Sequence, residues 1–263
     1  GIGSKAGSAR DQDFIEYVHQ ASMHSTMMFF TEMGRLYWLK VYELPEGNKQ
    51  SKGRAIQNMI NLQKGDKVRT CINVKGLNDQ EYVENHYLIF ITKNGLMKKT
   101  TLEAYSRPRA NGIIALGLRE GDELIGVTLT DGQSEMVVAS YNGKVCRFNE
   151  SGVRPMGRSA TGVKAITLEE DGQDRVIGTV CVEKNTDKTI LVISENGFGK
   201  RTPLDDENGE PIYRITNRGG KGVKTIEITE KTGHLVGIEG VTDDDDLMLI
   251  TKSGTAIRMD IST

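Results

Sequence analysis

Residues 213–226 read YRITNRGGKGVKTI, and the rest of the chain repeats the plan of this stretch. It holds three glycines and no acidic residue, and its basic residues are Arg214, Arg218, Lys221 and Lys224. Glycine lets a backbone turn tightly and approach a ligand closely, and the alternation that resumes at Val223 is typical of a strand. We therefore expect a cationic glycine turn at a strand edge. Such a turn suits a phosphate group, although most charged turns are simply solvated.

The pattern of a basic loop, a glycine and an apolar residue recurs along the chain. Its copies are QSKGRAI (50–56), PRANGIIAL (108–116), SATGVKAI (159–166) and GGKGVKTI (219–226), with GIGSKA (1–6) as a fifth. A second pattern alternates with it and consists of an apolar strand, a glycine turn and a short strand with basic residues. Its copies are MMFFTEMGRLYWLK (27–40), LIFITKNGLMKKT (88–100), MVVASYNGKVCRF (136–148), ILVISENGFGKRT (190–202) and LMLITKSGTAIRM (247–259). The turn glycines of the second pattern lie 48 to 61 residues apart, which indicates a repeat architecture.

Each repeated unit reads as four short strands: a hairpin, a long basic connection and two further strands. Apolar residues alternate, Asn-Gly turns separate the apolar runs, and no long stretch has a helical period. This pattern predicts an all-β, propeller-like array in one domain over 1–263. We expect units at 1–24 (partial), 25–80, 81–134, 135–186, 187–243 and 244–263 (partial), which is five blades' worth of sequence. A sandwich with accidental similarity is the alternative, but both patterns recur in the same order throughout.

Basic residues are concentrated in a few parts of the chain. The formal net charge is −2, which by itself argues against a nucleic-acid binder. However, 14 of the 34 Lys and Arg residues and none of the 36 acidic residues fall in five segments. These segments are 1–10, 48–54, 105–112, 151–164 and 212–224. If they share one face of the fold, that face is strongly positive and fits a polyanion.

Other features of the sequence exclude several classes of protein. The three cysteines, Cys71, Cys146 and Cys181, fit a reducing cytosol better than a disulfide framework or a zinc site. We recognise no signal peptide and no apolar run long enough for a transmembrane helix. The four histidines have neither metal-ligand spacing nor a paired nucleophile, and no GxxxxGK[ST] phosphate loop occurs. We therefore expect no enzyme activity, cofactor or metal in this chain on its own.

Four segments carry a resemblance to a known family. They are 33–62 (MGRLYWLKVYELPEGNKQSKGRAIQNMINL), 94–116 (NGLMKKTTLEAYSRPRANGIIAL), 148–168 (FNESGVRPMGRSATGVKAITL) and 196–202 (NGFGKRT). Together they resemble the C-terminal domain of the A subunit of bacterial DNA gyrase, a type IIA topoisomerase. The resemblance implies a β-pinwheel, which has six blades in that family and in which neighbouring blades exchange strands. It also implies that DNA wraps around a basic perimeter and so directs ATP-driven negative supercoiling.

The sequence departs from the family pattern at both ends. The family's Gln-basic-Arg-Gly-Gly-basic-Gly box, a feature of the first blade, would end at Gly1. The segment 216–222, TNRGGKG, echoes this box with Thr in place of Gln and Asn in place of the first basic residue. We therefore expect a fragment with half a blade at each end. The residues leave open whether these two halves pair and close a ring.

The resemblance also implies partners and site residues. It implies a non-catalytic domain that binds duplex DNA without sequence preference, because Lys and Arg contact phosphates without reading bases. The implied assembly is an A2B2 holoenzyme with the rest of gyrase A and with gyrase B, whose other parts use ATP and Mg. The implied location is the bacterial cytoplasm at the nucleoid, away from membranes, and we expect the isolated domain to be a monomer. The expected DNA-binding residues are Lys49, Lys52, Arg54, Lys98, Lys99, Arg107, Arg109, Arg154, Arg158, Lys164, Lys200, Arg201, Arg214, Arg218 and Lys221.

Three alternatives stay open at this point. The equivalent domain of topoisomerase IV has fewer intact blades and a degenerate or absent box, so the residues upstream of Gly1 would discriminate it. A propeller that binds proteins would use a face or a central channel and show weak salt dependence. A propeller enzyme is disfavoured, because no clustered carboxylates recur at matching positions.

Overall fold

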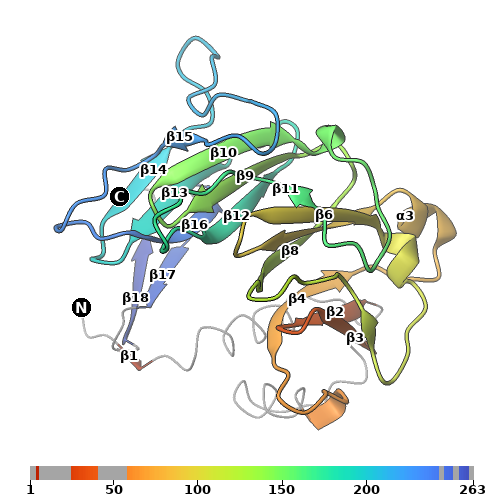
Figure 1. Cartoon of the computed structure of the whole chain (residues 1–263). Helices are drawn as coiled ribbons and strands as arrows, with labels where there is room; N and C mark the ends of the chain where they lie inside the picture. Colours follow the sequence, from red (N-terminus) through yellow and green to blue (C-terminus); the bar gives the residue numbers. More distant parts are fainter. Residues whose placement is uncertain (1–3, 6–24, 41–57, 243–245, 251–254, 261–263) are drawn as a thin grey trace.

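The chain folds as a series of repeated antiparallel sheets. The computed structural model describes residues 4–5, 25–40, 58–242, 246–250 and 255–260. These residues form five sheets, which follow one another around an arc (Figure 1). The expectation of an all-β, propeller-like array is confirmed.

Each sheet is one blade, numbered here in chain order of its hairpin. Blade one holds β4 (Val68–Val74), β2 (Thr26–Thr31), β3 (Arg35–Lys40) and β7 (Ile113–Ile114). Blade two holds β8 (Leu124–Thr130), β5 (Tyr87–Thr92), β6 (Leu96–Thr101) and β11 (Val163–Lys164). Blade three holds β12 (Val176–Val182), β9 (Glu135–Ser140), β10 (Lys144–Asn149) and β15 (Val223–Lys224). Blade four holds β16 (Leu235–Val241), β13 (Thr189–Ser194) and β14 (Gly199–Thr202). Blade five holds β17 (Asp246–Ile250), β18 (Thr255–Asp260) and β1 (Ser4–Lys5).

Blades one to three share a plan in which the outermost strand comes from the next unit along the chain. The first strand of each hairpin pairs with the unit's own long strand, and the second pairs with a two-residue strand from the following unit. Each unit contributes one long strand at the opposite edge of its blade. These strands pack against one another in the order β4, β8, β12 and β16, so they form the inner side of the array. The two-residue strands β7, β11 and β15 therefore lie at its outer perimeter.

The N-terminal strand pairs with the last hairpin. Ser4 lies opposite Ala256 and Lys5 lies opposite Thr255, in antiparallel register. Lys224 and Val223 take the same positions in blade three, opposite the first and second residues after the turn glycine Gly143. The structure thus pairs the two end segments, a point that the sequence had left open, and β1 occupies the place that the outer strands hold in other blades.

Short helices occupy three of the connections that the structure describes in full. They are α3 (Gln80–Glu84), η2 (Leu102–Tyr105) and η3 (Glu150–Gly152). The side chain of Asp79 caps α3 by accepting a hydrogen bond from the Tyr82 backbone N–H at 3.2 Å. The 3-10 helices η2 and η3 each follow the second hairpin strand, so they start the basic connections toward the perimeter.

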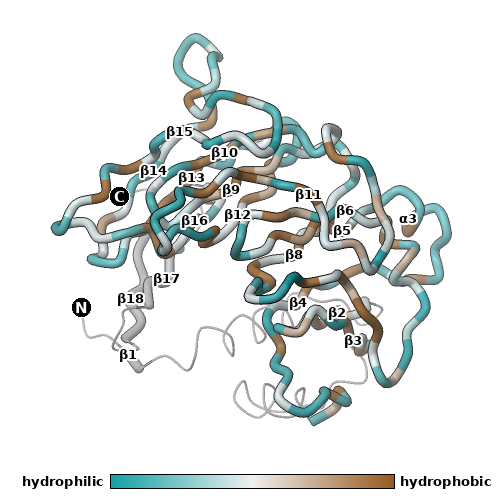
Figure 2. The backbone as a smooth tube through the Cα atoms, viewed as in Figure 1, coloured by the Kyte–Doolittle hydropathy of each residue, from teal (hydrophilic) through white to brown (hydrophobic). Residues whose placement is uncertain are grey.

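The hydrophobic core lies between neighbouring blades. Phe30 of blade one meets Phe90 of blade two edge to face, with ring centroids 5.5 Å apart, and both rings are fully buried. Equivalent clusters fill the spaces between blades two and three and between blades three and four. Figure 2 shows apolar residues along the hairpin strands and polar residues in the connections. The first hairpin strands of blades one to three are buried on both faces, so they read as nearly continuous apolar runs.

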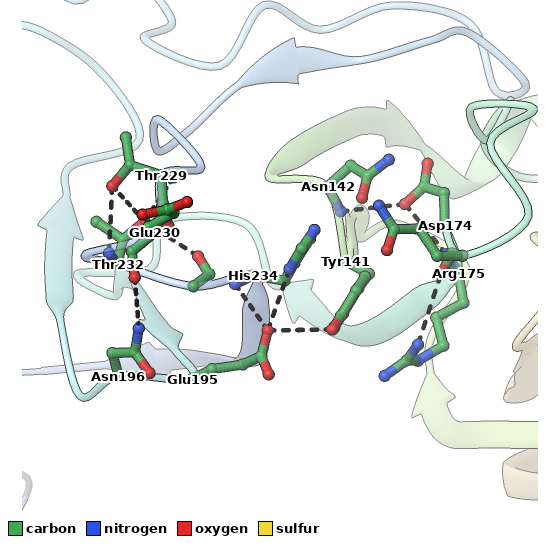
Figure 3. Close-up of polar contacts among 12 residues, drawn as sticks. Tyr141, Asn142, Asp174, Arg175, Glu195, Asn196, Thr229, Glu230, Thr232 and His234 are labelled. Carbon is green, nitrogen blue, oxygen red and sulfur yellow. Dashed lines mark hydrogen bonds and ion pairs between the residues drawn. The ribbon is translucent and has the colours of Figure 1, made fainter.

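A polar junction joins blades three and four at the hairpin turns (Figure 3). One carboxylate oxygen of Glu195 accepts hydrogen bonds from the Tyr141 hydroxyl at 3.0 Å and from the His234 backbone N–H at 2.9 Å. The rings of Tyr141 and His234 stack with centroids 4.1 Å apart and an interplanar angle of 2°. The guanidinium of Arg175 lies 3.9 Å from the Tyr141 ring centroid. These contacts fix the two blades relative to each other.

Candidate nucleic-acid interface

Each basic loop in the described part of the chain leaves its own blade and crosses the hairpin of the blade before it. The Met156 N–H donates to the Lys99 carbonyl at 2.7 Å, which places the loop 151–164 across blade two. The Thr216 N–H donates to the Arg147 carbonyl at 2.9 Å, which places the loop 212–224 across blade three in the same way. The loops 105–112, 151–164 and 212–224 are therefore laid over successive blades toward the perimeter.

Arginines join each of two basic loops to the outer strand that follows the preceding loop. Arg158 donates from Nη1 to the carbonyl oxygen of Ile114 at 3.1 Å, and Arg218 donates from Nη1 to the carbonyl oxygen of Lys164 at 3.2 Å. Each arginine stands four residues before the glycine that enters an outer strand. Both side chains remain exposed. The three loops consequently form one connected surface rather than separate patches.

The glycine in each loop lets the outer strand reach the neighbouring hairpin. Gly162 has a φ of 101°, and a Cβ there would overlap the carbonyl oxygen of Met97. Gly222 has a φ of 78°, and a Cβ there would lie 2.6 Å from the carbonyl oxygen of Val145. Only glycine combines this left-handed backbone with such a close approach. The recurring glycines thus hold the basic loops against the perimeter.

Two consecutive loops bring three arginines to one concavity. Arg107 and Arg109 from one loop and Arg158 from the next line it, together with Glu103 and Ile113. All three arginines are exposed, and none of them has an ion pair with a carboxylate among the residues that the structure describes. Guanidinium groups of this kind bind phosphate in a bidentate manner.

A second basic groove runs along the loop 212–224, which leaves blade four and crosses blade three. Arg214, Arg218 and Lys221 line it with the backbone of Gly219–Gly222. The three basic side chains are exposed, and Asn217 beside them adds a neutral donor. The groove lies over β15 and so continues the perimeter beyond blade two. Arg154 and Lys164, on the intervening loop, are also exposed.

Comparison with known proteins assigns the fold family. The model of the DNA gyrase C-terminal domain, beta-propeller, matches residues 25–75, 86–131, 134–183, 188–241 and 245–263. The chain belongs to this DNA gyrase C-terminal domain family.

Curated and solved relatives agree with the family. The chain is 43% identical over 262 residues to the DNA gyrase A subunit of Staphylococcus aureus, and the match spans 100% of this chain and 28% of that relative. A solved C-terminal domain of DNA topoisomerase IV matches with a TM-score of 0.77 and 26% identity, covering 91% of this chain and 71% of that one. A solved DNA gyrase A C-terminal domain matches with a TM-score of 0.69 and 24% identity, covering 91% and 73%, and supports the fold.

The gyrase-type fold buries two of the lysines that we expected to contact DNA. Lys98 is 0% exposed and donates from Nζ to the Ala115 carbonyl, the Tyr105 hydroxyl and the Arg158 carbonyl. Burial lowers the pKa of Lys98 to about 7, and the charge of Arg158 acts in the same direction. The expectation that Lys98 extends the DNA-binding surface is wrong, because its side chain is buried beneath the loop 151–164 and its ammonium group is bonded to protein atoms.

Lys99 is the second correction. It is 4% exposed, and its Nζ lies 3.2 Å from Oε1 of Glu150, which is itself fully buried. The Tyr87 ring lies beneath the same ammonium group, 4.6 Å from centroid to Nζ. Glu150 also accepts hydrogen bonds from the Thr130 hydroxyl and the Ser134 N–H. Lys99 is therefore the cation of an internal ion pair and cannot reach a ligand on the perimeter.

The remaining expected residues fall into two groups. Lys200 is exposed, with Nζ donating to the Thr225 carbonyl at 2.9 Å, and the half-buried Arg201 donates to the Thr189 hydroxyl at 2.7 Å. That Lys200 and Arg201 contact DNA therefore stays a prediction. The first-loop residues lie outside the described part of the chain; they are Lys49, Lys52 and Arg54.

One basic residue was omitted from the expected set. Lys224 takes the same place in β15 that Lys164 takes in β11, and both are exposed. Its Nζ lies 2.9 Å from Oε2 of Glu227, an exposed pair that salt weakens. Aligning the two copies on their glycines, Gly162 and Gly222, would have found it. Lys224 therefore belongs with the candidate interface.

Two further kinds of site were sought among the described residues. No group of three His, Cys, Asp or Glu side chains among them could hold a metal ion. None of their helices is long and apolar enough to cross a membrane. Of the cysteines, Cys71 and Cys146 are buried and all three are unlinked.

Proposed function

We propose that this chain binds duplex DNA along its perimeter and wraps it without reading base sequence. One observation carries the proposal: basic loops without acidic residues follow one another along the outer strands and are linked by hydrogen bonds. Arg158 donates to the Ile114 carbonyl, and Arg218 donates to the Lys164 carbonyl. A duplex lying along this surface would meet exposed cations over blades one, two and three. Such contacts neutralise phosphates and carry no sequence information.

The charge distribution fits this role in spite of the net charge of −2. Exposed basic side chains line the concavity at Arg107 and the groove at Arg214. Two acidic side chains adjoin this surface, Glu103 in the concavity and Glu227 beside Lys224, whereas Glu150 is buried. When basic side chains of the loops neutralise phosphates, counterions are released from the DNA, and this release favours binding at the loops.

Binding can be tested with a duplex of random sequence. Affinity should fall as salt rises, with a slope of log affinity against log salt of about −0.9 for each phosphate neutralised. Two duplexes of unrelated sequence should give the same slope and affinity. A slope near zero would contradict the proposal and favour a propeller that binds proteins.

Wrapping needs its own experiment, because binding alone does not bend DNA. A nicked circle is ligated with the chain bound, the chain is removed, and the linking number is measured. A handed shift that grows with protein concentration supports wrapping around the perimeter. An unchanged linking number despite saturated binding would reduce the proposal to binding without wrapping.

The whole-protein role follows from the family and remains part of the proposal. The chain spans 28% of its curated relatives, so its partner would be the remainder of a gyrase A subunit together with gyrase B, in an A2B2 assembly. In that assembly the domain is non-catalytic and directs negative supercoiling in the bacterial cytoplasm at the nucleoid. ATP and Mg would be used by other parts of the holoenzyme. The isolated domain would be a monomer.

Topoisomerase IV supplies the second candidate. The solved topoisomerase IV domain matches this fold with a TM-score of 0.77. On this reading the same perimeter would bind DNA without wrapping it in a fixed hand. The linking-number experiment separates the two roles, since the second predicts binding without a handed shift.

A further inference from the structure

The ammonium group of Lys98 joins two basic loops from inside the fold. Lys98 lies on β6 and its side chain is fully buried. Its Nζ donates to the Tyr105 hydroxyl at 2.9 Å, to the Arg158 carbonyl at 2.5 Å and to the Ala115 carbonyl. Tyr105 and Ala115 flank the loop that carries Arg107, whereas Arg158 belongs to the next loop. Lys98 therefore connects the two loops whose arginines line the concavity.

The same two loops are joined a second time at the surface. The Arg158 guanidinium donates to the carbonyl of Ile114 at 3.1 Å, and Ile114 directly precedes Ala115. The backbone of Arg158 thus faces the buried ammonium group, while its side chain lines the exposed concavity. A change at Lys98 acts directly on the position of Arg158.

The next pair of loops is joined without an ammonium group. In blade three, Cys146 takes the place of Lys98, three residues after the turn glycine. There the Gly219 backbone N–H donates to the carbonyl of Ala165, the counterpart of Ala115, at 2.7 Å. A backbone amide keeps its proton across the neutral pH range, whereas an amine can lose it. Of these two junctions, the one at Lys98 is therefore the one that protonation can change.

The surroundings of Lys98 bring its titration into the neutral range. Burial lowers its pKa to about 7, and the charge of Arg158 acts in the same direction. The other titratable group against it is Tyr105, and burial raises the pKa of that hydroxyl. The Phe90 ring lies 4.7 Å from Nζ, and no carboxylate of the described residues forms an ion pair with Lys98. Near neutral pH, Lys98 therefore populates both protonation states.

The number of donors on Nζ makes the junction sensitive to that proton. An ammonium group has three N–H donors, and all three have an acceptor here. The neutral amine has two donors and a lone pair. Either the carbonyl of Ala115 or Arg158 then loses this donor, or the Tyr105 hydroxyl turns toward the amine and away from Ala115, to which it donates at 2.7 Å. Each alternative weakens the connection between the loops, because a buried carbonyl without a donor is unfavourable.

An anion in the concavity acts on Lys98 through Arg158. The charged groups of the concavity are Arg107, Arg109, Arg158 and Glu103. A phosphate bound by the arginines offsets part of the charge that lowers the pKa of Lys98, so Lys98 holds its proton more tightly when phosphate is present. Linkage requires the converse as well: protonation of Lys98 strengthens phosphate binding.

We propose that Lys98 is a positioning residue of the DNA-binding surface: its ammonium group holds the two basic loops together, and phosphate binding in the concavity is coupled to proton uptake at Lys98. The inference rests on the proposed DNA binding and adds its dependence on pH. At low pH the free and the bound chain both hold the proton, and the coupling vanishes. As pH rises through the neutral range the free chain loses the proton first, so DNA affinity falls.

Calorimetry on the full chain tests the coupling. A duplex of random sequence is titrated in two buffers of different ionisation enthalpy, and the difference in heat gives the number of protons taken up. At about pH 7.5 the wild type should take up a fraction of a proton, and its affinity should fall by at most about tenfold per pH unit from there. Lys98→Met should lose this uptake. Its affinity should lie below that of the wild type at about pH 6.5 and approach it at about pH 8.5.

Two further variants make the comparison specific, because histidines also titrate near this range. Lys64→Met removes an exposed lysine outside the loops and should keep the uptake of the wild type. Arg158→Ala removes the charge that transmits the effect and should reduce the uptake. Arg158 is exposed, so this variant keeps the test decisive if Lys98→Met does not fold.

The outcomes separate this proposal from the proposed function. Uptake that is lost in Lys98→Met and reduced in Arg158→Ala, but kept in Lys64→Met, supports the coupling. Salt-dependent DNA binding with the same uptake and pH profile in the wild type, Lys98→Met and Arg158→Ala would overturn the coupling alone. A wild type that does not bind the duplex at any pH would overturn the proposed function and the coupling together.

Discussion

Arg218 donates a hydrogen bond from Nη1 to the carbonyl oxygen of Lys164, 3.2 Å away, although the two residues belong to loops of successive blades. Arg158 makes the same bond one blade earlier, to Ile114. One guanidinium thus fixes the path of a loop while its exposed face points to solvent. Charge and positioning are combined in a single side chain, and variants can separate them.

Arg158→Lys and Arg218→Lys together should keep the charge and lose the guanidinium bond. Because lysine is a point charge without the planar fork, we expect the salt slope of DNA binding to change little while the affinity falls. Binding isotherms at several salt concentrations measure both. An unchanged affinity would indicate that positioning through Ile114 and Lys164 is unimportant.

Arg107→Ala, Arg109→Ala, Arg154→Ala and Arg158→Ala together should flatten the salt slope by roughly 0.9 for each phosphate that the variant no longer neutralises. The circular dichroism spectrum should stay that of the wild type, because these side chains are exposed. The matched control removes exposed charges outside the loops, with Lys64→Ala, Arg119→Ala, Lys184→Ala and Lys231→Ala. If both sets flatten the slope equally, the basic loops are not the DNA-binding surface.

Lys99→Met should destabilise the fold and leave the salt slope unchanged. It leaves Glu150 as a buried carboxylate without its cation, which costs about 3–5 kcal/mol when one partner of a buried pair is removed. Urea unfolding measures the loss, and the double variant with Glu150→Gln should recover part of it. A flattened salt slope in a folded Lys99→Met chain would contradict the internal role of this lysine.

Gly162→Ala should destabilise the chain by about 2 kcal/mol or more, because φ is 101° and the new Cβ would overlap the Met97 carbonyl. Gly152→Ala is the control, since nothing lies within 4 Å of a Cβ there and its φ is not positive. Thermal unfolding of the two variants gives the comparison. Equal midpoints would show that the loop shifts without cost.

Lys98 should make stability depend on pH. Burial lowers its pKa to about 7 in the folded chain, whereas the unfolded chain keeps this proton up to about pH 10.4. Between these values the unfolded state binds more protons, so stability rises with pH, by at most about 1.4 kcal/mol per pH unit. The free energy of unfolding of the wild type minus that of Lys98→Met, measured from about pH 7 to 9.5, should therefore increase. A constant difference would contradict the lowered pKa.

The repeat could be predicted from the sequence because its signals are local. Turn glycines such as Gly95 and Gly143 adopt φ values of 90° and 87°, which few other residues accept. The alternation of apolar residues set the strands, and the spacing of Gly162 and Gly222 located the outer strands. The basic loops were recognisable for the same reason, since an acid-free segment is a property of consecutive residues.

Whether an individual lysine or arginine is buried or exposed could not be predicted in this way. Lys98 and Lys99 are neighbours on β6 and point to opposite faces of the sheet, so alternation alone would expose one of them. Both faces of blade two are covered by other blades, and each lysine meets partners far along the chain, Arg158 for one and Glu150 for the other. Similarly, only the register of β1 on β18 could show that the end segments pair.

The sequence by itself determined the repeated unit, the all-β class, the family and the clustering of basic residues in loops, because each of these is written in consecutive residues or in their period. Only the tertiary structure decided which cations reach solvent and how Arg158 and Arg218 connect successive loops. Those features depend on contacts between residues far apart in the chain, and no local pattern encodes which partner will cover a given side chain.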